Sequence, residues 1–74
     1  MRRYKNISGD SGVLTYQMGE DHILVTFRNG NTYRYTNKSA GKVHIAKMKA
    51  LAQEGLGLST YISQYVRDRY EDLF

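Results

Sequence analysis

The residues best suited to chemistry in this chain are cations interleaved with aromatic rings. The sequence has 11 Lys/Arg and seven tyrosines among 74 residues. Cations neutralise phosphates and release counterions, and aromatic rings stack on unpaired bases. The pattern therefore predicts contacts to nucleic acid, with phosphate contacts assigned to Arg28, Arg34, Lys38 and Lys42.

A second group of aromatic and basic residues lies toward the C-terminal end. Tyrosine and arginine are residue types that binding interfaces favour as anchors. A helix that packs on a core buries only one side, so the tyrosines of this segment cannot all be buried. We therefore expect a contact surface, for RNA or for a protein, that includes Tyr61, Arg67 and Tyr70.

The sequence offers no catalytic or metal-binding constellation. The two histidines, His22 and His44, are not spaced as a metal pair, and the chain has no cysteine. Glu20 and Asp21 could imitate a pair of catalytic carboxylates, but nothing places a nucleophile beside them. No glycine-rich phosphate loop leads from a strand into a helix. We expect no enzyme activity, no metal, no cofactor and no small-molecule substrate.

The charge of the chain is unevenly distributed. The net charge is +4, and residues 1–52 carry nine Lys/Arg against three acids, whereas residues 53–74 carry two against four. A basic body suits an anionic partner, although it also serves solubility. Neither an apolar run of membrane-spanning length nor a signal peptide is present. The simplest expectation is an intracellular protein without membrane contact.

These side chains must be positioned by a β-hairpin centred on Gly30. A two-residue Asn-Gly turn would place Tyr33 and Tyr35 on the open face of the sheet, where they could stack on bases. A three-residue loop with Gly30 left-handed and bulged pairs Val25 with Tyr33 and Ile23 with Tyr35. The second register gathers the apolar residues on one face, so we prefer it and expect Tyr33 and Tyr35 in the core.

The remaining pattern predicts an α+β fold. Strands are expected at about 13–18, 22–28 and 31–36, in an antiparallel meander. Two helices, at about 39–54 and 59–70, are expected to pack on one sheet face, with Gly55 ending the first. The expected caps are Asn37 or Ser39 for the first helix and Ser59 or Thr60 for the second. Residues 1–10 are interpreted as a basic flexible arm, and residues 11–74 as one domain.

The order of these motifs carries a family resemblance. Three motifs follow one another in the sequence. The first is Leu24-x-x-Phe27-x-x-Gly30-x-x-Tyr33-x-Tyr35, the second is an amphipathic helix, and the third is a segment that closes with Ile62-x-x-x-Val66-Arg67-x-Arg69-Tyr70. The pattern resembles the KTSC domain, a small bacterial and phage domain also found at the C-terminus of some lysyl-tRNA synthetases. The central Tyr-x-Tyr is its hallmark.

The resemblance covers residues 11–70. It implies the α+β fold, a bacterial or host-cell cytoplasm and RNA as the partner. The chain departs from the family in having no Val-Pro before the first helix and a different segment between the helices.

Two functions remain open at this stage. The first is a small non-enzymatic domain that binds RNA or another nucleic acid, which the family context favours. The second is a protein-interaction module, such as a phage-type inhibitor of the anti-CRISPR kind that docks on a larger enzyme. Unpaired strand edges could also form a homodimer. The Asp-Leu-Phe tail resembles the end of peptides that bind the bacterial sliding clamp, with a frayed or packed terminus as the alternative.

Overall fold

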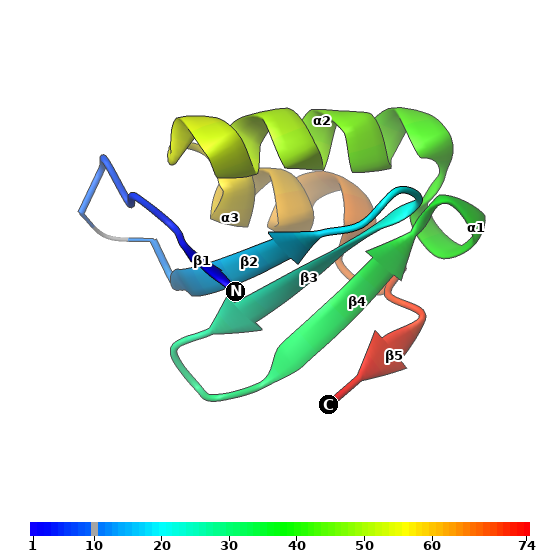
Figure 1. Ribbon diagram of the computed structural model, residues 1–74, viewed down its shortest axis with the longest axis horizontal. Coiled ribbons are helices and arrows are strands. Elements are labelled where there is room, and N and C mark those ends of the chain that lie inside the picture. Colours follow the sequence, from blue (N-terminus) through cyan, green and yellow to red (C-terminus); the bar gives the residue numbers. More distant parts are fainter. Residues whose placement is uncertain (10) are drawn as a thin grey trace.

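A five-stranded antiparallel sheet forms one layer of the computed structural model, which describes residues 1–9 and 11–74 (Figure 1). Its strands lie in chain order and are β1 (Arg2–Arg3), β2 (Val13–Met18), β3 (His22–Phe27), β4 (Thr32–Thr36) and β5 (Asp72–Leu73). The helical elements are α1 (Asn37–Ala40), α2 (Lys42–Glu54), α3 (Leu58–Tyr61) and a π-helical turn, η1 (Ile62–Val66). The α+β class and the three-stranded meander at the centre of the sheet are confirmed, whereas β1 and β5 were not predicted. Within the described residues, no helix has the length and apolarity needed to cross a membrane.

The hairpin between β3 and β4 has the predicted bulged turn. The Phe27 N–H donates to the Asn31 carbonyl at 3.0 Å, and the Gly30 N–H donates to the Phe27 carbonyl at 2.9 Å. Gly30 has a φ of 89°, which glycine adopts without steric cost. The three-residue loop therefore fixes the register of the whole hairpin.

This register decides which side chains enter the core. Val25 lies opposite Tyr33, and Ile23 lies opposite Tyr35, as predicted. Ile23, Val25 and Tyr35 are at most 1% exposed, and Tyr33 is partly buried against the same core. A shift of one residue would turn these side chains toward solvent, so their burial stabilises the observed pairing.

One apolar core lies between the sheet and the helices. On α2, the buried residues Ile45, Met48 and Ala52 recur at helical spacing, so they form one stripe facing the sheet. The other side of α2 is largely exposed. The full core comprises Tyr4, Val13, Tyr16, Ile23, Val25, Tyr35, Ala40, Ile45, Met48, Ala52, Leu58, Ile62 and Val66.

The first predicted helix is divided in two. Thr36 is the N-cap of α1, because its hydroxyl accepts from the Ser39 N–H and the Ser39 hydroxyl accepts from the Thr36 N–H, both at 3.0 Å. The expected cap was Asn37 or Ser39; Ser39 instead completes a capping box from the third position. Gly41, with a φ of 101°, then interrupts the helix before α2. Gly55 ends α2 in the left-handed conformation, as predicted.

The second helix is shorter than predicted. Gly57, not Ser59 or Thr60, precedes its first residue, and the helical turns end at Val66. The acidic residues that follow would be unfavourable near a helix C-terminus. Asp68 follows the last helical turn by two residues, whereas Glu71 and Asp72 lie beside and within β5, where the Glu71 N–H donates to the Arg34 carbonyl at 2.7 Å.

The segment 1–9 is attached to the sheet and helices, which differs from the expected flexible arm; Asp10 lies outside the described residues. Arg2 pairs with Tyr16 and Arg3 with Thr15, which adds β1 to the sheet. Tyr4 is 4% exposed, and its hydroxyl accepts a hydrogen bond from the Leu58 N–H at 3.2 Å. Burial of the Tyr4 ring is the physical reason that this basic segment follows the sheet edge.

Candidate nucleic-acid interface

Three aromatic rings gather where α2 meets α3 and η1. The rings of Tyr61 and Tyr65 have centroids 4.6 Å apart and are tilted by 36°. The His44 ring, from α2, lies 5.8 Å from Tyr61 and 5.9 Å from Tyr65. Tyr65 is 54% exposed. We call His44, Tyr61 and Tyr65 the ring cluster.

A hydrogen bond holds two members of the ring cluster together. His44 Nδ1 and the Tyr61 hydroxyl lie 2.7 Å apart. Desolvation raises the pKa of Tyr61, and the neighbouring Tyr65 raises it further. Tyr61 therefore keeps its phenolic proton at neutral pH, so the hydroxyl remains able to donate. The bond fixes the orientation of the Tyr61 ring, against which Tyr65 packs.

Tyr65 lies within the π-helical turn η1. π-Helical segments are rare and are frequent at functional sites. Here η1 follows α3 directly, so that Tyr65 remains on the same side of the helix as Tyr61, four residues earlier. That i, i+4 spacing is visible in the sequence, yet only Tyr61 of the pair was predicted as a contact residue, and His44 was considered only as a metal ligand and rejected. Only the pairing of α2 with α3 shows that they form one surface.

Most cations of the chain have no carboxylate partner. Arg34 is ion-paired, and Lys49 Nζ donates to the carbonyls of Gly19 and Glu20 at 2.7 and 3.0 Å. The other nine Lys/Arg (11 − 2) make no ion pair with any described carboxylate. Five of them are exposed on or directly after the helical elements: Lys38, Lys42, Lys47, Arg67 and Arg69.

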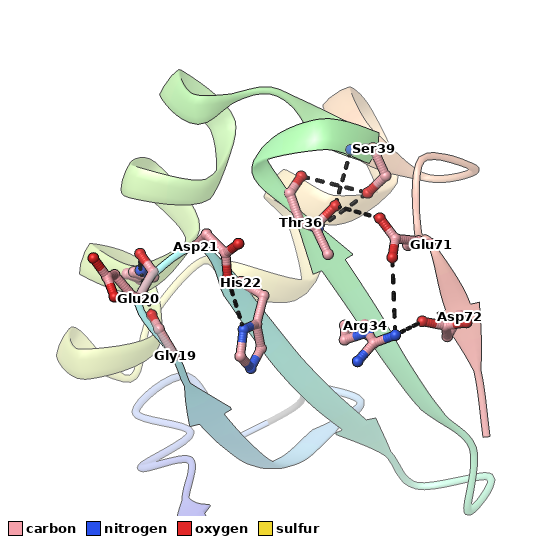
Figure 2. A network of polar contacts seen from close by, with 10 residues as sticks. Gly19, Glu20, Asp21, His22, Arg34, Thr36, Ser39, Glu71 and Asp72 are labelled. Carbon is pink, nitrogen blue, oxygen red and sulfur yellow. Dashed lines mark hydrogen bonds and ion pairs between the residues drawn. The ribbon is translucent and has the colours of Figure 1, made fainter.

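The predicted phosphate contact Arg34 is ion-paired, and it lines a surface hollow together with Lys38 of α1. Arg34 lies on the sheet face opposite the core, where its guanidinium contacts the Asp72 carboxylate and lies 3.8 Å from that of Glu71 (Figure 2). Thr36 Oγ1 donates to Glu71 Oε1 at 2.9 Å. The guanidinium also lies 5.8 Å from the centre of the Phe74 ring. The charge of Arg34 is therefore balanced within the fold.

The remaining predicted residues are divided between the surface and the interior. Arg28 is exposed in the hairpin turn. Tyr70 is partly buried and packs edge-on against Tyr33, with ring centroids 4.9 Å apart, and lies 6.3 Å from Tyr35. Burial raises the pKa of Tyr35, and Tyr33 and Tyr70 add to the effect. Tyr33, Tyr35 and Tyr70 thus form an aromatic wall of the core. Lys42, Tyr61 and Arg67 lie on or directly after the helical elements, whereas Lys38 of α1 lies at the hollow beside Arg34.

A polar pair lies at the start of β3. His22 Nδ1 is 3.2 Å from Asp21 Oδ1, and this hydrogen bond lowers the pKa of Asp21 (Figure 2). Together with Arg34, Thr36 and Glu71, the pair lines a polar hollow of about 290 Å³. Within the described part of the chain, no three His, Cys, Asp or Glu side chains are grouped so that they could hold a metal ion.

Comparison of the chain with family models, curated proteins and solved structures found no match in any of the three.

Proposed function

We propose that this chain is a small non-enzymatic domain that binds single-stranded RNA or another single-stranded nucleic acid through its helical layer. One observation supports this most: the ring cluster, of which Tyr65 is the exposed member, belongs to the same layer as four cations that have no carboxylate partner among the described residues, namely Lys42, Lys47, Arg67 and Arg69. Glu54 and Asp68 are the only two acids in the sequence between Asn37 and Tyr70, so the layer has an excess of positive charge.

The two kinds of residue have complementary roles in this proposal. Tyr65 offers a ring face to an unpaired base, a contact worth about 1–3 kcal/mol per base. Lys47 lies one helical turn after His44, on the same side of α2, and is positioned to contact a phosphate. Bases within a duplex are stacked on each other, so a ring platform favours a single strand.

We also retain membership of the KTSC family as a proposal. It rests on the motif order around Tyr33 and Tyr35 and agrees with the α+β architecture. Membership would favour RNA over DNA and a bacterial or host-cell cytoplasm.

The test is a binding titration with fluorescent single-stranded RNA at several salt concentrations. We expect Tyr65→Ala to weaken binding about 5- to 150-fold, which corresponds to loss of about 1–3 kcal/mol of stacking. We expect Lys47→Ala to weaken binding to all sequences and to reduce the salt slope by about 0.7. Phe74→Ala, an exposed ring on the opposite face, and Arg2→Ala are the matched controls. Equal effects of Tyr65→Ala and Phe74→Ala, or binding that is independent of salt, would contradict the proposal.

A second candidate function is a protein-interaction module, which would include small inhibitors of the anti-CRISPR kind. The observation that favours it is Val43, an apolar side chain 81% exposed and adjacent in sequence to His44. Protein interfaces combine apolar residues with tyrosine anchors. Val43→Lys separates the two functions. A nucleic acid would bind the variant at least as tightly because it gains a cation, whereas a protein partner would lose an apolar contact and bind more weakly.

A further inference from the structure

A cavity of about 340 Å³ opens beside the β3–β4 turn, away from the ring cluster. Gly12, Phe27, Arg28, Asn29 and Tyr33 line it. The Phe27 and Tyr33 rings meet edge to face, with centroids 5.5 Å apart and planes at 85°. Cavities that hold small ligands begin at about 300 Å³ and are largely apolar with a few polar groups. This cavity has that volume and a largely apolar lining, and it is shallow and open to solvent.

The polar groups of the cavity are held in place by the turn. Asn29 Oδ1 accepts from the Asn31 N–H at 2.9 Å, which leaves the Asn29 amide nitrogen as a donor. The Arg28 N–H donates to the Gly12 carbonyl at 2.8 Å and ties the turn to the residue before β2. The Arg28 side chain is exposed and has no ion pair with a described carboxylate. Two aromatic rings, an amide donor and a guanidinium that pairs with none of the described carboxylates thus line the same cavity.

We propose that this cavity receives one unpaired base of the bound strand, with Arg28 contacting a neighbouring phosphate. The inference rests on the proposed function and extends it to a second base-binding position. The apolar wall formed by the Phe27 and Tyr33 rings suits a planar base, the Asn29 amide donates to an acceptor on its edge, and the guanidinium pairs with phosphate. Such a site requires an extruded base, so it excludes an intact duplex as the ligand.

Gly12 provides a direct way to fill the cavity. Its backbone does not have the positive φ that restricts a position to glycine, and an added Cβ would lie 3.8 Å from Phe27 Cδ1, an ordinary contact distance. A leucine side chain at this position would therefore occupy the space of the base without straining the backbone. Asn29→Ala, at an exposed position of the turn, removes the amide donor and provides an independent variant.

The first experiment is an NMR titration of the full chain with uridine 5′-monophosphate, with ribose 5-phosphate as the control ligand. We expect the monophosphate to shift the resonances of Gly12, Phe27, Asn29 and Tyr33, and ribose 5-phosphate to shift only those near Arg28. Gly12→Leu should abolish the base-dependent shifts, while Gln17→Leu, at an exposed position of β2 outside the cavity lining, should preserve them. Resonances that do not move with the monophosphate, or that move equally with ribose 5-phosphate, would overturn the inference.

The second experiment measures binding of the same variants to single-stranded RNA. Gly12→Leu, Arg28→Ala and Asn29→Ala should each weaken binding at least 5-fold, against unchanged binding by Gln17→Leu and Arg2→Ala. RNA binding that depends on Tyr65 but is unaffected by all three cavity variants would overturn the cavity inference and leave the proposed function standing. A chain that binds no RNA even at low salt would overturn both.

Discussion

Arg34 and Asp72 face each other across the β4–β5 pair although they lie 38 positions apart in the sequence. The guanidinium contacts the Asp72 carboxylate, and Glu71 approaches it from the neighbouring position (Figure 2). The three side chains are each about 40% exposed, so solvent screens their attraction. Together with the backbone hydrogen bonds between the two strands, the contact attaches β5 to the edge of β4 after the last helical turn.

Neutralising the acidic side of this contact should loosen β5. We expect the double variant Glu71→Gln, Asp72→Asn to lose about 1 kcal/mol of unfolding free energy at low salt and less at high salt, because added salt screens the pair. Urea denaturation at the two salt concentrations measures the change. Asp68→Asn is the control, since Asp68 has no ion pair with a described cation. Equal losses in the double variant and the control would show that β5 is held by its backbone hydrogen bonds alone.

Tyr4 tests whether the N-terminal segment belongs to the folded domain. Tyr4→Phe removes the acceptor for the buried Leu58 N–H and should destabilise the protein by about 1–3 kcal/mol. Tyr4→Ala should cost about 3–5 kcal/mol, since it also removes a ring from the core. Thermal unfolding of the two variants measures both effects. Wild-type stability in Tyr4→Ala would support the flexible arm that the sequence suggested.

Two features disfavour a side chain at Gly55: its left-handed backbone and the close approach of Lys5. Gly30 shares only the first feature, so it serves as the matched control. Gly55→Ala and Gly30→Ala both place a Cβ on a left-handed residue, with φ values of 77° and 89°, at a cost of about 1–2 kcal/mol. At Gly30 nothing lies within 4 Å of the new atom, whereas at Gly55 it would overlap Lys5 Cβ. We expect Gly55→Ala to cost at least about 1 kcal/mol more, as overpacking does. Equal urea midpoints for Gly55→Ala and Gly30→Ala would mean that residues 1–9 move aside for the new methyl group at no cost in stability.

High pH should destabilise the protein through Tyr35. Burial raises the pKa of Tyr35, so the unfolded chain loses this proton near pH 10 while the folded chain retains it. Above about pH 10 the unfolded state therefore binds fewer protons, and the free energy of unfolding falls as the pH rises. Urea midpoints on either side of this pH measure the fall. Tyr35→Phe has no phenolic proton to lose, so its free energy of unfolding should fall less steeply above about pH 10. An equally steep fall in Tyr35→Phe would mean that other groups cause the loss of stability at high pH.

The hairpin could be predicted because its constraints are local. The bulged loop at Gly30 and the alternation of Ile23, Val25, Tyr33 and Tyr35 act over a few residues, and only one register buries all four. The stripe on α2 and the stop at Gly55 followed from helical periodicity and from the backbone freedom of glycine in the same way.

The elements that were not predicted depend on distant partners. β5 requires Arg34 opposite Asp72, and β1 requires the pocket that buries Tyr4; neither is visible in the terminal residues themselves. In the candidate site, too, the local features could be predicted and those that depend on distant residues could not. Tyr61 was predicted from its residue type, whereas the ring cluster exists because α2 brings His44 against it, 17 residues away in sequence.

The strand order also determines how long the edge of β4 stays unpaired during synthesis. The residue that covers Arg34 is translated 38 positions later, which takes about 2 to 8 s at ordinary elongation rates. For that interval the outer edge of β4 presents unpaired backbone groups, the arrangement that invites pairing with another chain. Nascent chains on crowded polysomes would therefore be most prone to associate in this interval, and the arrival of the acidic pair at 71–72 closes it.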